Sequence, residues 1–190
     1  MPSPTPDEEL QARTMTLEAF ADTIVPGEKR SPDDRAVAGA SHGGGAVAAG
    51  AIELLEWDAT GVHDGLDWFA SALNDHARAY ATEHGLAPDE TVPPFVALGF
   101  EHRTALVQKL TLPGHPEKPL WVSLALFSNM AYDSAAHMHT ADALAAGHPG
   151  LIAMGIERPD PDGLWRFPEF SYGRKLANLH PDTTSTGSPA

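Results

Sequence analysis

The chain has 190 residues, with 26 acidic and 12 basic side chains and a formal net charge of −14. Nucleic acids and anionic membranes would be repelled by so acidic a surface, and we expect neither as a partner. The hydrophobic content of 42% is typical of a globular protein with one buried core, and the lack of cysteine excludes disulfides and thiolate chemistry.

The two ends of the chain differ in composition from its middle. Residues 1–14 are acidic and rich in proline, and they contain no basic start followed by an apolar stretch, as a secretory signal would. We therefore expect a cytoplasmic protein with a flexible N-terminus over residues 1–14. A single helical domain is expected over residues 15–180, and the polar residues 181–190 are expected to form a disordered tail.

Helical periodicity begins at residue 16. Thr16 is a suitable N-cap for a helix with apolar residues at helical spacing, which the Pro26-Gly27 pair would end. A helix is also compatible with residues 37–57, despite the glycines there. The clearest amphipathic helix covers residues 64–85, in which Gly85 fits the C-terminal cap. Its apolar stripe consists of Leu66, Phe69, Ala70, Leu73, Ala77 and Tyr80.

The second half of the chain continues in the same way. Residues 93–114 predict one or two shorter helices, with proline at the start and Pro113-Gly114 at the end. A long helix-compatible run follows over residues 117–150, in which Tyr132 to His148 are expected to form one helix. Alternating β-branched strands are almost absent. The sequence therefore predicts an all-α bundle of about five to six helices with an irregular C-terminal arm.

A cluster of polar residues lies in the run from Met130 to Gly150, which contains Asp133, His137, His139, Asp142 and His148. On a helix Asp133 and His137 share one face, where they could bind a metal or exchange a proton. His139 would point about 160° away from His137. A metal site would need ligands from another helix, such as a Glu-x-x-His pair, and none occurs. The alternative is that these polar residues face solvent or a partner.

A run of glycines at residues 43–45 also allows two interpretations. Gly43, Gly45 and Ala48 match a dinucleotide-binding pattern, but no predicted strand precedes them, as that pattern requires. Small residues also let another backbone approach closely, and this is the interpretation that we favour. The surrounding stretch, residues 36–55, is too polar and too rich in glycine to span a membrane.

The C-terminal arm gathers aromatic and basic side chains within an irregular stretch, Asp162 to Leu176. Such residues are enriched at protein interfaces, although the arm could instead lie as a strap over the chain's own core. The expected partner-binding residues are Trp165, Arg166, Phe167, Phe170, Tyr172 and Arg174. No nucleophile elbow, catalytic triad or phosphate-binding loop occurs, so we expect no catalytic residue and no cofactor-binding residue.

Two stretches resemble a known family. The opening "TLEAFADTIVPG" resembles the start of the gluconate 2-dehydrogenase subunit 3 family. The late blocks "LFSNMAYDSAAHMH" and "GLIAMGIERPDPDGLWRFPEFSYG" resemble its C-terminal half, in which a helix is followed by a glycine-rich arm with a tryptophan. The likeness extends over roughly residues 15 to 180, and it is greatest to a cytoplasmic actinobacterial branch of that family.

The resemblance implies a small, non-catalytic helical subunit in a hetero-oligomer. Its partner would be a flavin-dependent oxidoreductase of the glucose–methanol–choline type, which carries FAD and oxidises an alcohol or sugar. Family members often have a twin-arginine export signal and some have a cysteine pair, and this sequence has neither. Two alternatives stay open: a metal-dependent helical enzyme that uses Asp133 and His137, and a stand-alone binding protein.

Overall fold

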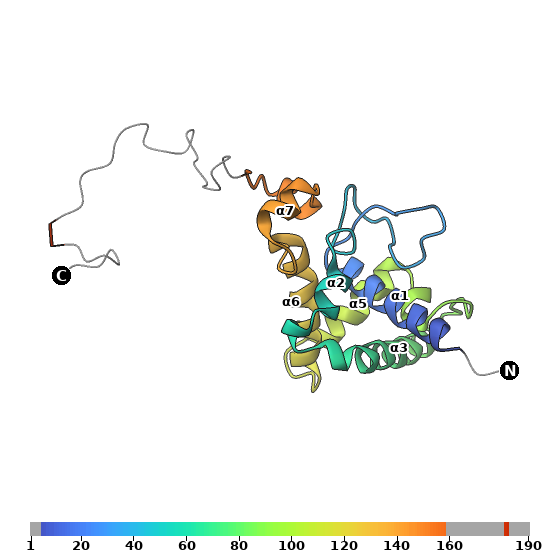
Figure 1. Ribbon diagram of the computed structural model, residues 1–190. Helices are drawn as coiled ribbons and strands as arrows, with labels where there is room; N and C mark the ends of the chain where they lie inside the picture. Colours follow the sequence, from blue (N-terminus) through green and yellow to red (C-terminus); the bar gives the residue numbers. More distant parts are fainter. Residues whose placement is uncertain (1–4, 159–180, 183–190) are drawn as a thin grey trace. The chain divides into compact units, whose positions relative to one another are not determined.

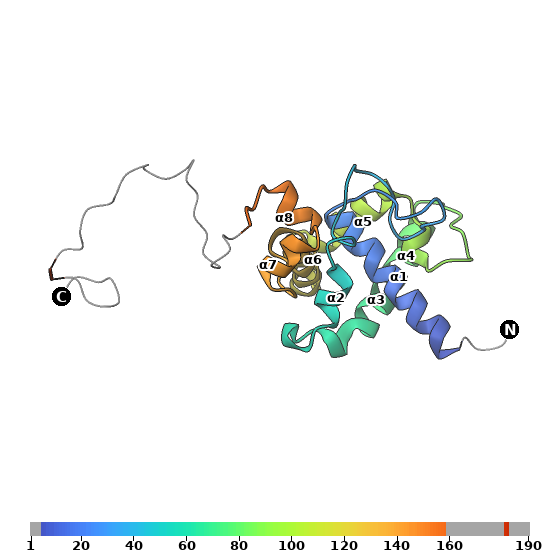
Figure 2. The same cartoon turned by 45° about the horizontal axis from the view of Figure 1, so that its top comes forward.

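The fold is all-α, as the sequence predicts. The structure is a computed structural model that describes residues 5–158 and 181–182. The chain divides into two units, residues 1–156 and residues 157–190, and the helices of the described residues lie in the first. They are α1 (Pro6–Ile24), α2 (Ala51–Glu56), α3 (Leu66–Glu83), α4 (Pro94–Ala97), α5 (Phe100–Thr111), α6 (Lys118–Ser134), α7 (Thr140–Ala145) and α8 (Pro149–Ala153), with short 3₁₀ turns at Asp58–Thr60 and His63–Gly65 (Figures 1 and 2).

The first helix begins earlier than expected. Thr5 caps α1 in a capping box, in which its side chain accepts from the backbone N–H of Glu8 and the Glu8 carboxylate accepts from the N–H of Thr5. Residues 6–14, expected to be flexible, are therefore helical. Thr16 is not the N-cap: it is buried within the helix, and its hydroxyl donates to the carbonyl of Ala12.

The core lies where α1 meets α3, α4, α5 and α6. Phe20 of α1 lies at its centre, with ring centroids 6.5 Å from Phe95 of α4 and 6.3 Å from Trp121 of α6. All three rings are buried. Because aromatic side chains of this size dominate the energy of burial, this contact fixes the helices relative to one another.

The α3 and α5 regions agree closely with the sequence analysis. The six residues of the predicted α3 stripe are all buried, and Gly85 follows the helix with a φ of 62°. Left-handed backbone of this kind favours glycine, which explains why the helix ends there. The predicted "one or two" helices over residues 93–114 are two, α4 and α5.

The helix expected over residues 37–57 is wrong. Most of that stretch is an irregular loop, and only α2 is helical. Gly39, Gly43 and Gly50 have positive φ, which interrupts any helix. Gly45 lies so close to Gly27 and to the carbonyl of Val25 that a side chain at either glycine would overlap the facing backbone. The close approach expected of the glycine run is therefore confirmed, but it occurs in a loop.

Two buried charges hold this loop on the helices. Asp22 of α1 accepts hydrogen bonds from the backbone N–H groups of Gly27 (3.1 Å) and Ala38 (2.8 Å). Burial raises the pKa of the Asp22 carboxyl, against the opposing effect of these bonds and of the Arg103 charge. Arg103 of α5 donates to four backbone carbonyls, and burial lowers its pKa to about 10. The acceptors are Arg35, Ala36, Val96 and Leu98.

The helix expected from Tyr132 to His148 is also wrong. α6 ends at Ser134, because Ala135 takes a left-handed backbone with a φ of 48°. A turn leads to α7, and α8 then returns to pack against α6. A small apolar cluster holds the three pieces together and consists of Ala135, Ala143, Leu144 and Leu151.

Gly150 makes the return of α8 possible. It lies against the last turn of α6, where a side chain at this position would overlap the carbonyl of Tyr132.

Within residues 5–158, no helix is long and apolar enough to cross a membrane.

Candidate functional site

The break after Ser134 separates the polar residues that the sequence analysis grouped. Asp133 is exposed on α6 and accepts a hydrogen bond from the Asn129 amide at 2.7 Å. His137 lies in the following turn, and His139 is the exposed N-cap residue of α7. Asp133 and His137 therefore do not share a helical face, which was the geometric reason for pairing them as metal ligands.

His137 packs instead on the backbone before α2. Its ring lies over Gly50 so closely that a side chain there would overlap it. Its Nδ1 is buried and has no hydrogen-bond partner among the described residues. Burial lowers the pKa of His137, partly offset by the nearby carboxylate of Glu53, and the charge of His148 lowers it further. The structure therefore favours a neutral imidazole.

His148 links α8 to the same segment. Its side chain is buried, its Nδ1 accepts from the backbone N–H of Leu151 at 3.3 Å, and its Nε2 lies 3.1 Å from the carbonyl oxygen of Ala49. Because Leu151 N–H can only donate and the Ala49 carbonyl can only accept, the proton of a neutral ring must be on Nε2. His148 thereby caps α8 and ties it to the loop before α2.

These contacts give the histidines a positioning role in the described structure. No group of three or more His, Asp or Glu side chains within residues 5–158 is arranged to hold a metal ion. His137 contacts Gly50, and His148 binds the carbonyl of the preceding residue, Ala49. Their arrangement therefore accounts for where α8 lies, without an acid/base reaction.

A second histidine contact orders the start of α6. The Glu117 carboxylate lies 2.7 Å from His76 Nε2 and accepts from the indole N–H of Trp121 at 2.9 Å. The His76 bond, followed by that from Trp121, lowers the pKa of Glu117. Because Trp121 is fully buried in the core, this arrangement satisfies its only polar atom and fixes the first turn of α6.

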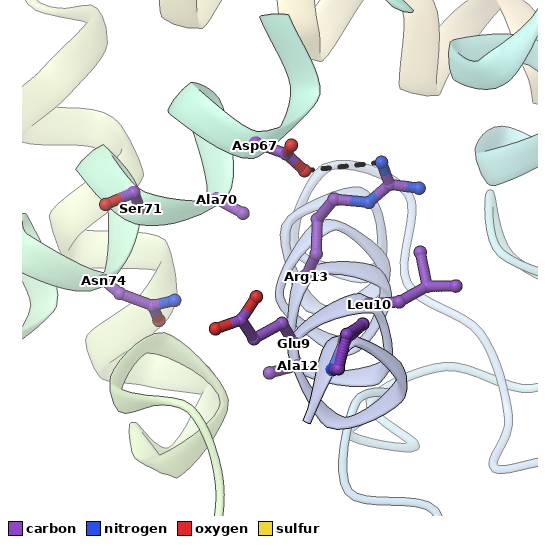
Figure 3. Close-up of a pocket in the computed structure, with 9 residues that line it drawn as sticks. Glu9, Leu10, Ala12, Arg13, Asp67, Ala70, Ser71 and Asn74 are labelled. Atoms are coloured by element: carbon purple, nitrogen blue, oxygen red, sulfur yellow. Dashed lines mark hydrogen bonds and ion pairs between the residues drawn. The ribbon is translucent and has the colours of Figure 1, made fainter. Parts of the chain in front are cut away.

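An open groove of ≈ 590 Å³ lies between α1 and α3 (Figure 3). Arg13 reaches across it to Asp67 at 3.4 Å and also binds Glu56 at 2.6 Å. The Asn74 amide donates to Thr16 and accepts from the Phe95 N–H, so it is committed to helix packing. These polar groups join helices and do not converge on a reacting atom.

Exposed apolar side chains are the remaining feature. Ile152, Met154 and Ile156 follow one another at α8 and just beyond it, with exposed fractions of 58%, 46% and 42%. We call these three residues the exit patch, because they lie where the chain leaves the first unit. Large exposed apolar groups that are close together mark interaction surfaces more often than single ones do.

The partner-binding residues expected from the sequence lie farther along the chain than the exit patch, and the exit patch was not among them. The six expected partner-binding residues, Trp165, Arg166, Phe167, Phe170, Tyr172 and Arg174, lie outside the described residues. The run "GLIAMGI" contains four large apolar residues, of which Leu151 is buried and the other three are exposed.

Comparison with known proteins gives one family. The description "Family of unknown function (DUF5987)" belongs to the family that matches residues 11–190. No curated protein and no solved structure matches the chain.

Proposed function

We propose that this chain, which belongs to the DUF5987 family, is a non-catalytic accessory subunit that binds and stabilises an FAD-dependent oxidoreductase. The partner carries the flavin and oxidises an alcohol or sugar, and the chain itself binds no cofactor. The complex works in the cytoplasm, a point that fractionation of cells expressing the tagged chain tests.

The exit patch is the observation that carries the proposal. Three large apolar side chains within five positions, those of Ile152, Met154 and Ile156, are exposed, although His148 binds Ala49 and Gly150 packs against Tyr132 of α6. Covering such side chains yields about 25 cal/mol for each Å² of apolar surface removed from water. A partner with a matching apolar surface would therefore bind here.

The class of partner comes from the resemblance described above. The stretches at residues 16–27, 126–139 and 150–173 resemble the small subunits of glucose–methanol–choline type oxidoreductases. The aromatic and basic arm begins at Asp162, eight residues after Met154, and its residues are typical of interface anchors.

The test is co-expression of the chain with the flavoprotein encoded beside it, followed by gel filtration. We expect one complex that contains both proteins and the absorbance of FAD. Ile152→Glu should weaken the complex, and Trp165→Ala should weaken it roughly 30-fold, because aromatic anchors lose about 2 kcal/mol or more on truncation. Arg166→Ala and Tyr172→Ala should follow in order of effect.

The matched control is Leu10→Glu. Leu10 is 51% exposed on α1, far along the chain from the exit patch, so this substitution adds the same charge at a comparable apolar site. It should leave the complex intact. Separate elution of two stable proteins would contradict the proposal, and so would equal weakening by Leu10→Glu and Ile152→Glu.

A further inference from the structure

α6 has apolar residues on two opposite faces. Its inner face buries Trp121, Leu124, Ser128 and Ala131 in the core. At 100° per residue, Pro119, Val122, Leu126 and Met130 fall within about 80° on the opposite face. We call these four residues the α6 strip. Leu126 is 57% exposed and Met130 is 39% exposed.

The α6 strip has the features of a helix–helix contact. Its residues are spaced by three and four positions, as along the seam between two packed helices. A helix that faces only water carries polar residues there, and an apolar outer face indicates that something covers it. In Figure 1 α6 lies along an edge of the helical unit, with α2 on its inner side.

The charges at the two ends of α6 indicate what covers it. Lys118 is the first residue of the helix and Asp133 lies in its last turn, and the sequence between them contains no charged residue. The strip is therefore neutral, with a cation at one end and an anion at the other. A surface of this kind is complementary to itself when it is turned end for end.

We propose that two copies of the chain pair through α6, antiparallel about a two-fold axis at Leu126. In this register each Leu126 meets its counterpart, and Val122 lies opposite Met130 of the second copy. Lys118 then lies beside Asp133 of the second copy, at both ends of the contact. A parallel pair would instead bring like charges together, which is unfavourable.

The inference goes beyond the proposed function, because it concerns the chain alone. Two helices of about 25 Å form a contact at the low end of specific interface sizes. The net charge of −14 on each copy opposes association further. We therefore expect a reversible monomer–dimer equilibrium that depends on protein concentration.

Analytical ultracentrifugation of the full chain over a range of concentrations tests this inference. Leu126→Glu should weaken dimerisation at least about tenfold, because it places two carboxylates at the two-fold axis. The matched control is Leu10→Glu, at a residue of α1 that is 51% exposed, which should dimerise like the wild type. Circular dichroism confirms that each variant is helical.

Charge reversal tests the register and does not depend on the folding of Leu126→Glu. Lys118→Glu and Asp133→Lys should each weaken the dimer, and the double variant should restore it, because the two ends then attract again. A chain that is monomeric at every concentration would overturn the inference, including the case in which residues after 158 cover the strip. A dimer that Leu126→Glu leaves unchanged, or that the double variant does not restore, would also overturn it.

Discussion

Gly150→Ala is the substitution that most directly probes how α8 is held. The added methyl group would overlap the carbonyl oxygen of Tyr132 and lie 2.7 Å from its carbonyl carbon. Both atoms belong to the backbone of α6, so neither can move aside by a change of rotamer. The backbone of Gly150 itself does not have a positive φ, so alanine meets no conformational strain there. The substitution therefore isolates the steric effect.

The magnitude follows from the two ways in which the structure can respond. If α8 stays in place, the overpacking costs about 1–3 kcal/mol. If α8 separates from α6, Leu151 becomes exposed and the hydrogen bonds of His148 are lost, at about 1.5–3 kcal/mol for the side chain and roughly 1 kcal/mol for the bonds. The two routes together limit the loss in the free energy of unfolding to about 1–4 kcal/mol.

Urea denaturation followed by circular dichroism measures this loss. Gly99→Ala is the matched control: Gly99 has a φ of −62°, and a methyl group there would meet no described atom within 4 Å. The control should stay within about 0.5 kcal/mol of the wild type. If Gly150→Ala is as stable as Gly99→Ala, the close approach of α8 to α6 is not what holds the exit patch in place.

Three further predictions follow from the packing and the buried charges. Gly44→Leu should reduce the free energy of unfolding by about 1–3 kcal/mol, because even a methyl group there would lie 2.8 Å from Pro149; an unchanged melting temperature would mean that this glycine lies in a free loop. Arg103→Met should cost about 3–5 kcal/mol in a thermal or urea melt, since it leaves buried carbonyls and Asp22 without their cation, whereas Arg78→Ala on the surface should cost under about 0.5 kcal/mol. Because the pKa of His137 is lowered in the folded chain, the unfolded chain binds a proton at this histidine at a higher pH than the folded chain does. The free energy of unfolding should therefore fall as the pH drops from about 6.5 to the pKa of the folded state. His137→Leu should flatten this part of the plot of stability against pH, and equal slopes for the variant and the wild type would refute the lowered pKa.

A helix could be predicted from the local sequence where the spacing of its apolar residues and the residue that ends it indicate the same element. The stripe of α3 and the glycine after it predicted both the buried face and the end of that helix. The start of α1 was also readable, because Thr5-Pro6-Asp7-Glu8 is a capping box with proline at the first helical position. The acidic and proline-rich composition suggested flexibility instead, and that interpretation was wrong for residues 6–14.

The irregular loop could not be predicted, because distant side chains determine its backbone. The N–H of Ala38 is satisfied by Asp22, sixteen residues away, and the carbonyl of Ala36 by Arg103, sixty-seven residues away. Within residues 37–57 alone, these backbone N–H and carbonyl groups have no partners except those that a helix would supply, so the local sequence favours a helix.

The end of α6 had no local signal either. Ala135 is the residue type that most favours a helix, yet it takes a left-handed conformation here. The cause is tertiary: Ala135 is fully buried against Leu144 and Leu151, which can reach it only if the chain turns back. This turn also moves His137 away from the face of Asp133, so the grouping of the two depended on a helix that does not form.

Binding of a flavoprotein at the exit patch can be measured directly with purified proteins. Isothermal titration measures how tightly the purified FAD-containing flavoprotein binds the wild-type chain, Ile152→Glu and Leu10→Glu. We expect saturable binding by the wild type and by Leu10→Glu, and binding by Ile152→Glu that is weaker at least about tenfold. Binding of equal strength by all three, or no binding by the wild type, would contradict it.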